Sequence, residues 1–520
     1  MAEQAVDIAR AVVTEPTALR DWVVVLPLVL PLLGGAAALV LRERIAWQRG
    51  IALVVLAALV VVDAALLVRV VEDGPLTMMM GRWLPPFGIA FTVDALGATL
   101  ALTSAVVALP AAVYAGVDID TGGRRYGFFP FLMLLVAGVS GAFLTGDIFN
   151  LYVWFEVLLI ASFGLIVLGG EPRQLDGAVR YGLLNLVATT LFLVATAYLY
   201  GLVGTLNMAD ITAAVRALPP EAPIDTIAAL YLLAFGMKAA AFPLHFWLPA
   251  SYHTPKIVVA AVFAGLLTKV GVYALLRTLV MLMPAEGVAL SAIVGWVAGL
   301  TMVVAALAAL AQTEIRRALG FLVITGIGAM LAGLAIGSPL ALSGTIVYAV
   351  HSILAMTAIY LAVGAVERVA GSSSLATVGG VYATNPLLAA LFLMLALAVA
   401  GLPPFSGFWP KAMLVKASLA ADEGWLAAAV LVSGFLQTVA LGRIWLLAFW
   451  RPRPGGPVAT AGGGAAVLEP AAIGPVIVLT GLVVLLGVAA EPLVRVAGIG
   501  AAGLLDPAAY VGSVFGGTAP

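Results

Sequence analysis

A few ionisable side chains lie inside long apolar runs of the sequence, where a charge is costly. Lys238, Lys269 and Lys411 are three of the five lysines in the chain, which also holds twenty arginines. At the depth of a bilayer an ionisable group costs at least ~2.5–3.5 kcal/mol on insertion scales. Lysine changes its pKa readily on burial, whereas arginine stays charged. Lysines at these positions therefore favour proton handling over simple anchoring, for which arginine would serve as well.

Two more groups complete a candidate relay. Glu156 lies in the middle of FNLYVWFEVLLIASFGL and is a natural counter-charge for Lys238, because such a pair holds both groups charged until it separates. His351 lies in the apolar run GTIVYAVHSILAMTAIYL. We expect Glu156 with Lys238, then Lys269, His351 and Lys411, as successive relay groups joined by water. Structural roles stay open for each of them: a salt bridge, a lysine reaching an interface, or a hydrogen-bonded core histidine.

Other polar residues near the apolar runs have plainer interpretations. For His245 and His253 a structural hydrogen bond is the better hypothesis, and Asp147 in TGDIFN is expected to cap a helix. Asp63 and Asp94 either tune an access path or bind a partner, and the sequence does not decide between them. No metal-ligand spacing, phosphate-binding loop, dinucleotide fingerprint or nucleophile elbow occurs, so we expect no cofactor and no metal site.

The composition indicates that the protein surface faces lipid and not water. Hydrophobic residues make up 63% of the chain and charged residues 10%, with a mean hydropathy of +1.15, against about 25% charged residues in a soluble domain. Too little polar surface remains to cover a water-soluble globule, so lipid must surround most of the outside. The lack of cysteine excludes disulfides and thiolate or iron–sulfur ligation, and a net charge of −1 gives no sign of a nucleic-acid partner.

Apolar windows of roughly 20 residues predict an all-α polytopic membrane protein with about 14 transmembrane helices. Each span must be helical, because only helices or closed barrels satisfy the backbone in lipid, and these runs do not alternate as barrel strands do. Residues 204–217 are either a short interfacial helix or a loop, and residues 453–464 form a flexible linker. The windows lie at residues 22–41, 51–70, 92–117, 126–146, 148–169, 179–203, 226–244, 256–281, 287–310, 318–337, 341–365, 384–418, 424–450 and 471–490.

The loop charges predict the orientation. Basic residues gather in the loops after odd-numbered helices and acidic residues on the opposite side, so the positive-inside rule places both termini outside. Residues before Trp22 are acidic on balance, unlike the basic start of a cleaved signal. The first span is therefore expected to stay, in a multi-pass protein of the cell (plasma) membrane whose short loops leave no room for a soluble catalytic domain.

Two spans contain proline where a helix should continue. They read GMKAAAFPLHFWLP, residues 236–249, and GLPPFSGFWPK, residues 401–411. Proline removes a backbone donor and clashes with the preceding turn, and irregular backbone at membrane depth is tolerated only inside protein or beside a water-filled cavity. The two breaks are alike and lie five helices apart, which is the pattern of inverted-repeat transporters. Simple kinks in tightly packed helices are the alternative.

These two segments, together with GDIFNLYVWFEVLLIASFGLIVLGG and AVFAGLLTKVGVYAL, resemble the antiporter-like membrane subunits shared by respiratory complex I and Mrp-type multisubunit sodium/proton antiporters. The resemblance covers about residues 92–450 and is strongest to the Mrp D subunits. It implies two inverted five-helix repeats with broken helices 7 and 12. The implied division is 1–120 (helices 1–3), 121–282 (first repeat, helices 4–8), 283–452 (second repeat, helices 9–13) and 453–520 (linker, helix 14 and tail).

The resemblance also assigns roles to the candidate relay residues. It matches Glu156 to the helix-5 glutamate, Lys238 to the lysine of broken helix 7, Lys269 to the helix-8 lysine, and Lys411 to the helix-12 lysine that ends the relay. In the family the histidine of helix 11, here His351, is followed about one turn later by a lysine, but that position holds Met356. The central relay must therefore pass through His351 and water, or run elsewhere.

Together these observations predict a proton-translocating subunit of a multisubunit Na⁺/H⁺ antiporter, exchanging external protons for internal sodium, and not an enzyme with redox chemistry of its own. The family implies the other Mrp antiporter subunits as partners, besides Na⁺, H⁺ and lipid. Three alternatives stay open. They are an antiporter-like subunit of complex I or of a membrane-bound hydrogenase, a stand-alone solute transporter, and a scaffold subunit whose buried charges only hold packing.

Overall fold

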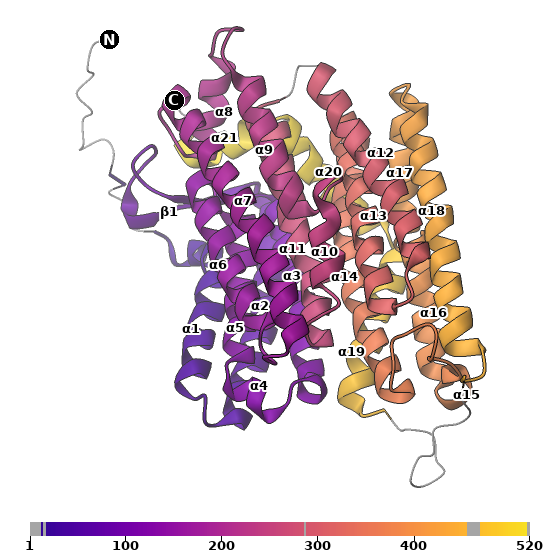
Figure 1. Cartoon of the computed structure of the whole chain (residues 1–520). Helices are drawn as coiled ribbons and strands as arrows, with labels where there is room; N and C mark the ends of the chain where they lie inside the picture. The colour runs from indigo at the N-terminus through magenta and orange to yellow at the C-terminus, as the bar shows by residue number, and fades with distance from the viewer. Residues whose placement is uncertain (1–11, 14–16, 285–287, 455–467, 517–520) are drawn as a thin grey trace.

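The computed structural model describes residues 12–13, 17–284, 288–454 and 468–516, and helices make up most of these ranges. A helix satisfies the N–H and C=O groups of an apolar run within itself, as lipid requires, and each predicted window contains one. Most of the helices run side by side along one direction and form a single bundle (Figure 1). The prediction of an all-α polytopic protein is confirmed.

The elements follow the chain in two groups of helices, joined through the centre of the bundle. The first group comprises η2 (Leu19–Val24), α1 (Leu26–Val40), α2 (Ile45–Asp73), β1 (Leu76–Met79), η3 (Met80–Arg82), β2 (Ala90–Val93), α3 (Ala95–Asp118), α4 (Thr121–Arg125), α5 (Phe128–Leu144), α6 (Ile148–Ile166), α7 (Pro172–Val203), α8 (Met208–Arg216), α9 (Ile224–Ala239), η4 (Leu244–Phe246), α10 (Trp247–Ser251), α11 (Ile257–Leu276) and the π-helical η5 (Arg277–Leu282). The second comprises α12 (Val288–Ala311), α13 (Ile315–Ile336), α14 (Pro339–Ala370), α15 (Val381–Thr384), α16 (Pro386–Ala400), α17 (Phe408–Ala420), α18 (Gly424–Trp445), the π-helical η6 (Leu446–Trp450), α19 (Pro470–Val488), α20 (Glu491–Leu505) and α21 (Ala508–Phe515).

Within the described ranges, eleven helices are long and apolar enough to cross a membrane, or up to twelve if the bent pair α20–α21 counts as one span. Three shorter apolar helices, α1, α5 and α16, occupy other predicted windows. The two most closely packed helix pairs, α12 with α13 and α5 with α6, are neighbours in sequence, as expected for helices joined by short connections. The total of fourteen spans and the inverted repeats stay predictions.

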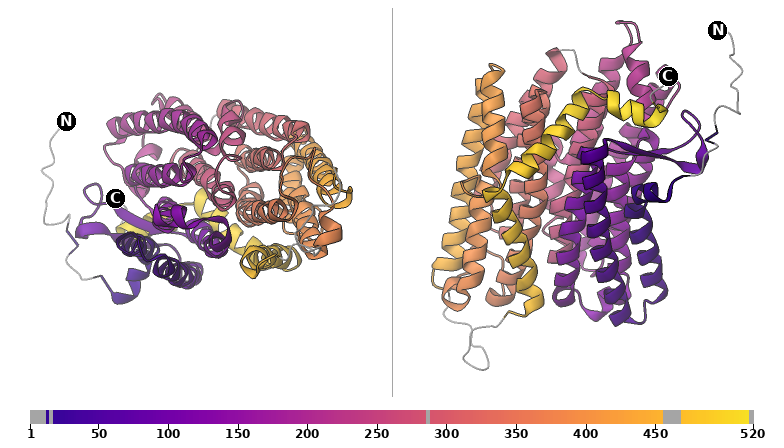
Figure 2. Two further views of the ribbon diagram at one scale, coloured as in Figure 1. Left: turned by 60° about the horizontal axis from the view of Figure 1, so that its bottom comes forward. Right: turned by 180° about the vertical axis from the view of Figure 1, so that it is seen from behind.

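Helices α11 and α14 form the centre of the bundle. The apolar windows of both are buried along their whole length, and the two helices pack against each other. The other helices of the two groups lie on either side of them (Figure 2, left). A Cβ atom at Gly265 of α11 would lie 2.3 Å from Thr357 Oγ1 of α14, so a small residue is required for this close approach.

Both predicted interruptions are present. In the first, α9 ends at Ala239, Ala240 adopts a left-handed conformation with φ of 62°, and the chain resumes as η4 and α10. In the second, α16 ends at Ala400, Gly401 has φ of 88°, and α17 begins at Phe408. Proline follows both helix ends as expected. Around the breaks Ala241, Phe405 and Ser406 are buried, whereas Pro243, Phe246 and residues 402–404 are exposed, so the irregular backbone lies only partly inside this chain.

One end of the bundle, which we call the hairpin end, carries elements that hydropathy did not indicate. Strands β1 and β2 form an antiparallel hairpin with Leu76 opposite Val93. Helix α21 contacts both strands and α8, and η2 also contacts the hairpin, so the two outermost described elements of the chain meet there. Helix α20 crosses behind the bundle against α3 and α14 (Figure 2, right).

These elements change two sequence-based expectations. Residues 204–217, for which the sequence allowed either a short helix or a loop, contain α8. The predicted C-terminal tail forms α20 and α21. The predicted linker at 453–464 lies outside the described residues except for its first two. We call the opposite end of the bundle the arginine end, after Arg124, Arg173 and Arg316. There, Asp118 Oδ2 at the end of α3 accepts a hydrogen bond from Val258 N at the start of α11.

The α11–α14 contact gives a prediction for stability. Gly265→Ala should lower the free energy of unfolding by about 1–3 kcal/mol, because the added methyl group overlaps Thr357 and forces two buried helices apart. The measurement is the thermal midpoint of the detergent-purified protein. Gly481→Ala in α19, where a Cβ would meet nothing within 4 Å, should leave the midpoint unchanged. A native midpoint for Gly265→Ala would mean that the helices do not approach so closely.

Candidate functional site

Lys238 lies in the last turn of α9, immediately before the first break, and is only 5% exposed. Its Nζ donates a hydrogen bond to Thr189 Oγ1 of α7 at 2.9 Å and lies 4.7 Å from the centroid of the Phe155 ring. A cation over an aromatic face is attracted by the ring quadrupole. The ammonium group is thus held by a hydroxyl and a ring, without an acid in direct contact.

Glu156 follows Phe155 on α6 and is half-buried, with its Oε1 buried and without a hydrogen-bond partner. The expected direct ion pair with Lys238 is not formed, since no nitrogen–oxygen contact within 4.0 Å joins the two residues. The two residues are nonetheless in the same neighbourhood, because the Lys238 ammonium group lies over the ring of Phe155, the residue before Glu156. The helices meet instead through stacked Phe155 and Phe235 rings, whose centroids are 5.8 Å apart, and this aromatic packing explains why the charges stay apart.

Lys269 lies in the middle of the buried helix α11 and is 1% exposed. Its Nζ donates to the carbonyl oxygen of Ala264, one turn earlier, at 2.6 Å. The neighbouring Thr268 Oγ1 and the Ser352 Oγ of α14 are both buried and have no hydrogen-bond partner in the described chain. Buried hydroxyl groups of this kind are where internal water is normally held. Thr268, next to Lys269, and Ser352, next to His351, therefore provide polar groups for a relay.

His351 of α14 is anchored by the second break. Its Nδ1 lies 2.8 Å from Ser406 Oγ, and its ring packs edge-on against Tyr348 with 5.8 Å between centroids. A Cβ at Gly407 would lie 2.9 Å from the His351 ring and 2.0 Å from the carbonyl oxygen of Ala398. The glycine of the break therefore makes room for the imidazole, and the hydrogen bond at Nδ1 leaves Nε2 for proton exchange.

Lys411 lies in the first turn of α17, after the second break, and its Nζ has three acceptors. They are the carbonyl oxygens of Val399 at 3.1 Å and Ala400 at 2.7 Å, and Gln437 Oε1 of α18 at 2.7 Å. The last carbonyls of a helix have no partner within it and carry partial negative charge. The end of α16 therefore provides a built site for an ammonium group, and a Cβ at Gly401 would collide with the Lys411 side chain.

The structure thus brings one predicted lysine to each break and places Lys269 and His351 on the two central helices, α11 and α14. His351 and Lys411 both contact the second break, the histidine through Ser406 and the lysine through the carbonyl oxygens at the end of α16. Met356, the position at which the sequence resemblance led us to expect a lysine, is buried in α14 and has no titratable group. The hydroxyl of the next residue, Thr357, donates to the Ile353 carbonyl.

The plainer sequence interpretations have mixed outcomes. Asp147 caps α6 through a hydrogen bond from Asn150 N to its Oδ1 at 2.7 Å, and His253 Nδ1 lies 2.9 Å from the Pro249 carbonyl oxygen, as predicted. The prediction for His245 is wrong, because its buried Nδ1 has no partner and its ring stacks on Phe242. Asp63 is completely buried in α2, and neither of its carboxylate oxygens has a hydrogen-bond partner.

A polar pocket of about 420 Å³ lies at the arginine end, between the two helix groups. Its walls include the bidentate Arg316–Glu367 ion pair, whose Nε–Oε1 distance is 2.6 Å. His253 in the loop before α11 faces this pocket, and burial, the largest cause, lowers its pKa, so it is neutral near pH 7. Sequence reasoning did not single out this pocket, because its residues come from four separate loops and helix ends.

The comparisons with known proteins agree with this architecture. The family model described as NADH:quinone oxidoreductase/Mrp antiporter, TM matches residues 145–437. The D subunit of the Na⁺/H⁺ antiporter of Alkalihalophilus pseudofirmus is 37% identical over 493 residues, covering 95% of this chain and 99% of that protein. The corresponding D subunit of Bacillus subtilis is 34% identical over 450 residues, covering 86% and 91%.

Solved structures show the same fold. A chain of the Mrp complex from Dietzia sp. superposes with a TM-score of 0.88 at 27% identity, covering 96% of this chain and all of that one. A chain of respiratory complex I from Thermus thermophilus gives a TM-score of 0.80 at 25% identity, covering 93% and 99%. Fold and site therefore define a polytopic membrane subunit of the antiporter-like class. The chain belongs to the NADH:quinone oxidoreductase/Mrp antiporter membrane-subunit family, and its resemblance to the Mrp D subunits is confirmed.

The contacts of Lys411 predict a coupled effect on stability. Gln437→Leu should lower the free energy of unfolding by about 1–3 kcal/mol, because it removes one acceptor from a buried ammonium group. In the double variant with Lys411→Met the loss should be smaller than the sum of the two single losses, since no buried charge is left unsatisfied. The measurement is a double-mutant cycle of thermal midpoints, and strictly additive losses would contradict the contact.

Proposed function

We propose that this chain is the proton-translocating subunit of a multisubunit Na⁺/H⁺ antiporter. The observation that carries the proposal is the pair of interrupted helices, each with a buried lysine beside its break and with His351 anchored to the second. Ionisable groups at such positions are costly and are found where ions move. The relatives named as antiporter D subunits support sodium and protons as the exchanged ions.

The relay begins at Lys238. An approach of Glu156 to this lysine favours its charged form, and a withdrawal favours release of the proton, because a nearby opposite charge stabilises the ammonium group. Since the two groups interact without touching, small movements of α6 relative to α9 change that balance. The proton released is accepted by the amine of Lys269, whose position on the central helix α11 connects the two helix groups.

His351 and Lys411 form the second part of the relay. The imidazole accepts a proton at Nε2 while Ser406 holds Nδ1, and its neighbour Lys411 responds because like charges nearby disfavour each other. The unpartnered hydroxyls of Thr268 and Ser352 support a hydrated path past Met356. In this proposal, water and His351 replace the lysine that other members of the family have in α14.

The same proposal extends to orientation and assembly. Both outermost described elements lie at the hairpin end. We infer from the basic loops at the arginine end and the positive-inside rule that the hairpin end, with both termini, faces outside the cell. In this proposal each break lies inside one of two inverted repeats, which comprise residues 121–282 and 283–452. The likeness to a chain of the Mrp complex supports assembly with the other Mrp subunits in the cell membrane.

A second candidate role is a membrane subunit of a respiratory oxidoreductase. The likeness to a chain of complex I over nearly the whole length favours it, and the same helices would then be driven by a redox partner. Purification of the native assembly separates the two roles. Flavin or iron–sulfur absorbance in the purified assembly would support the oxidoreductase, and a colourless, sodium-responsive assembly supports the antiporter.

The central prediction concerns Lys238 and Glu156. Lys238→Ala and Glu156→Ala should each reduce sodium-driven proton movement by at least about 100-fold, in line with the loss of a proton-transfer group. The measurement uses everted vesicles that carry the whole complex, normalised to assembled complex. Lys416→Ala is the matched control, because this lysine is exposed on α17. Native exchange in assembled Lys238→Ala and Glu156→Ala vesicles would show that both residues are structural.

A further inference from the structure

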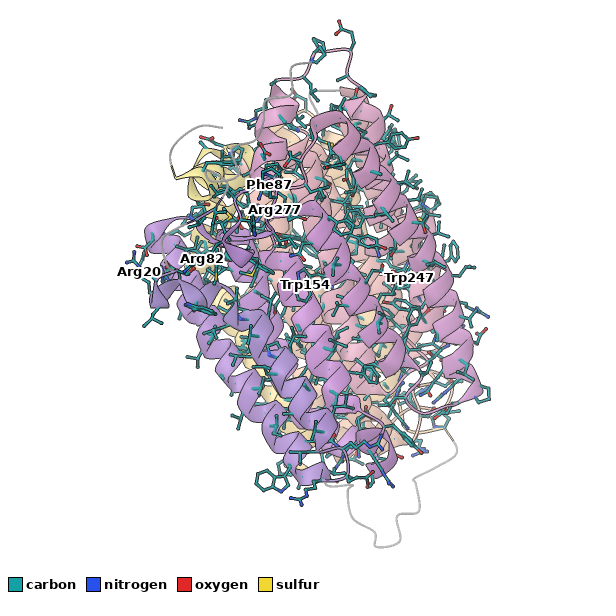
Figure 3. All side chains as sticks on the ribbon, turned by 90° about the vertical axis from the view of Figure 1, so that its left-hand side faces the viewer. Arg20, Arg82, Phe87, Trp154, Trp247 and Arg277 are labelled. Atoms are coloured by element: carbon teal, nitrogen blue, oxygen red, sulfur yellow. The ribbon has the colours of Figure 1, made fainter. Side chains whose placement is uncertain are left out.

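A second buried charge cluster lies outside the relay, toward the hairpin end. Arg277 begins the π-helical segment η5 and is completely buried. Its Nη2 donates to Asp94 Oδ1 at 2.6 Å and its Nε to the Tyr273 hydroxyl at 3.0 Å. The guanidinium also lies 5.1 Å from the ring centroid of Tyr273 and 5.3 Å from that of Tyr510. Figure 3 shows Arg277 toward the end of the bundle where the C-terminal helices, in yellow, are found.

The Arg277–Asp94 ion pair has more polar contacts than packing alone would require. A buried pair adds little net stability, and apolar residues of similar volume often replace one without loss. Here all three guanidinium nitrogens are engaged, the third with Met281 Sδ at 3.3 Å, and Asp94 Oδ1 also accepts from Gly97 N at 2.9 Å. Since arginine does not lose its proton in proteins, the guanidinium keeps its charge at this place, and the Asp94 carboxylate beside it balances that charge.

That charge lies on the same helix as a relay lysine. Lys269, Tyr273 and Arg277 are spaced four residues apart and therefore share one face of α11 and its π-helical continuation. The Lys269 Nζ points the other way, toward the arginine end, where it donates to Ala264. Between the two charges the Tyr273 hydroxyl donates to the carbonyl oxygen of Phe143 at 2.9 Å.

On the other side of the ion pair, hydroxyl groups continue to the surface. Thr92 of β2 is buried and interacts with the Tyr510 side chain of α21. Thr77 Oγ1 of β1 donates to Thr92 Oγ1 at 3.1 Å and lies 2.8 Å from Ser513 Oγ. Thr77 and Ser513 are half-buried and so reach the solvent side. A column of polar groups thus runs from the hairpin end to Arg277, and Lys269 lies two helical turns beyond.

We propose that the Arg277–Asp94 pair is a seal that closes this column and prevents protons and cations from passing between the hairpin end and Lys269. An arginine keeps its protons and therefore does not relay one. Its contacts with Asp94, Tyr273 and Met281 hold the guanidinium across the column, where a proton or a hydrated cation would have to pass. Tyr510 covers the guanidinium, so α21 completes the seal. The inference rests on the proposed relay: with the seal, Lys269 exchanges protons only within the relay and toward the arginine end, and no proton crosses without sodium.

The test is the passive proton leak of everted vesicles that carry the whole complex, without sodium. Arg277→Gln combined with Asp94→Asn keeps the polar groups but removes both charges. A pH gradient should collapse several-fold faster per assembled complex than with native protein. Asp21→Asn, which breaks the half-exposed Arg69–Asp21 ion pair of 3.1 Å near the hairpin, should leak no more than native protein.

Each outcome decides the proposal. Adding Lys269→Ala to the double variant should abolish the extra leak, and a leak that persists would overturn the connection to Lys269. A native leak rate in assembled double variant would overturn the seal and make the pair structural. Should the double variant not assemble, Tyr510→Ala, which uncovers the guanidinium, gives the same test with the same outcomes. Failure of the relay itself is recognised separately, by persistent sodium-driven exchange in Lys238→Ala vesicles.

Discussion

Lipid offers the backbone no hydrogen-bond partner, and the rest of the structure depends on how the protein meets this constraint at its two interrupted helices. At the second break the last carbonyls of α16, those of Val399 and Ala400, accept hydrogen bonds from the Lys411 ammonium group. At the first, Trp247 Nε1 donates to the carbonyl of Met237 at 3.0 Å. Where a helix stops inside the bilayer, a side chain takes over its hydrogen bonds, and at one of the two breaks that side chain is charged.

Charge and conformation are consequently linked around α14. Lys411 satisfies three acceptors only while it keeps its protons, so loss of a proton leaves fewer donors for the end of α16 and for Gln437. His351 is joined to the same break through Ser406. A change of protonation at either residue therefore alters the contacts of one irregular segment. That segment packs between buried helices, and close-packed interiors transmit such changes to their neighbours. This is the physical basis on which a relay is able to act on neighbouring helices.

Sequence patterns predicted the parts of the molecule that depend on local chemistry. Apolar windows identified the helices, prolines identified both breaks, and ionisable residues in apolar runs identified the buried lysines. Long-range contacts were not predictable. The hairpin strands have four residues each, too few for a periodic signal. Arg277 lies at the end of its window, where arginine commonly reaches an interface, and its partner Asp94 is 183 residues away. The Glu156–Lys238 separation depends on aromatic packing that no spacing rule describes.

The contact between α21 and the hairpin has a consequence for biosynthesis. Thr77 and Ser513 touch although 436 residues separate them, so the hairpin leaves the ribosome long before the helix that covers it. The early helices are able to insert and pack in order of synthesis, because most of their contacts are with neighbours in sequence. The hairpin end of the first group nevertheless stays open to water until α21 has been translated and has docked. Every nascent chain therefore passes through an inserted state that is uncovered on that side.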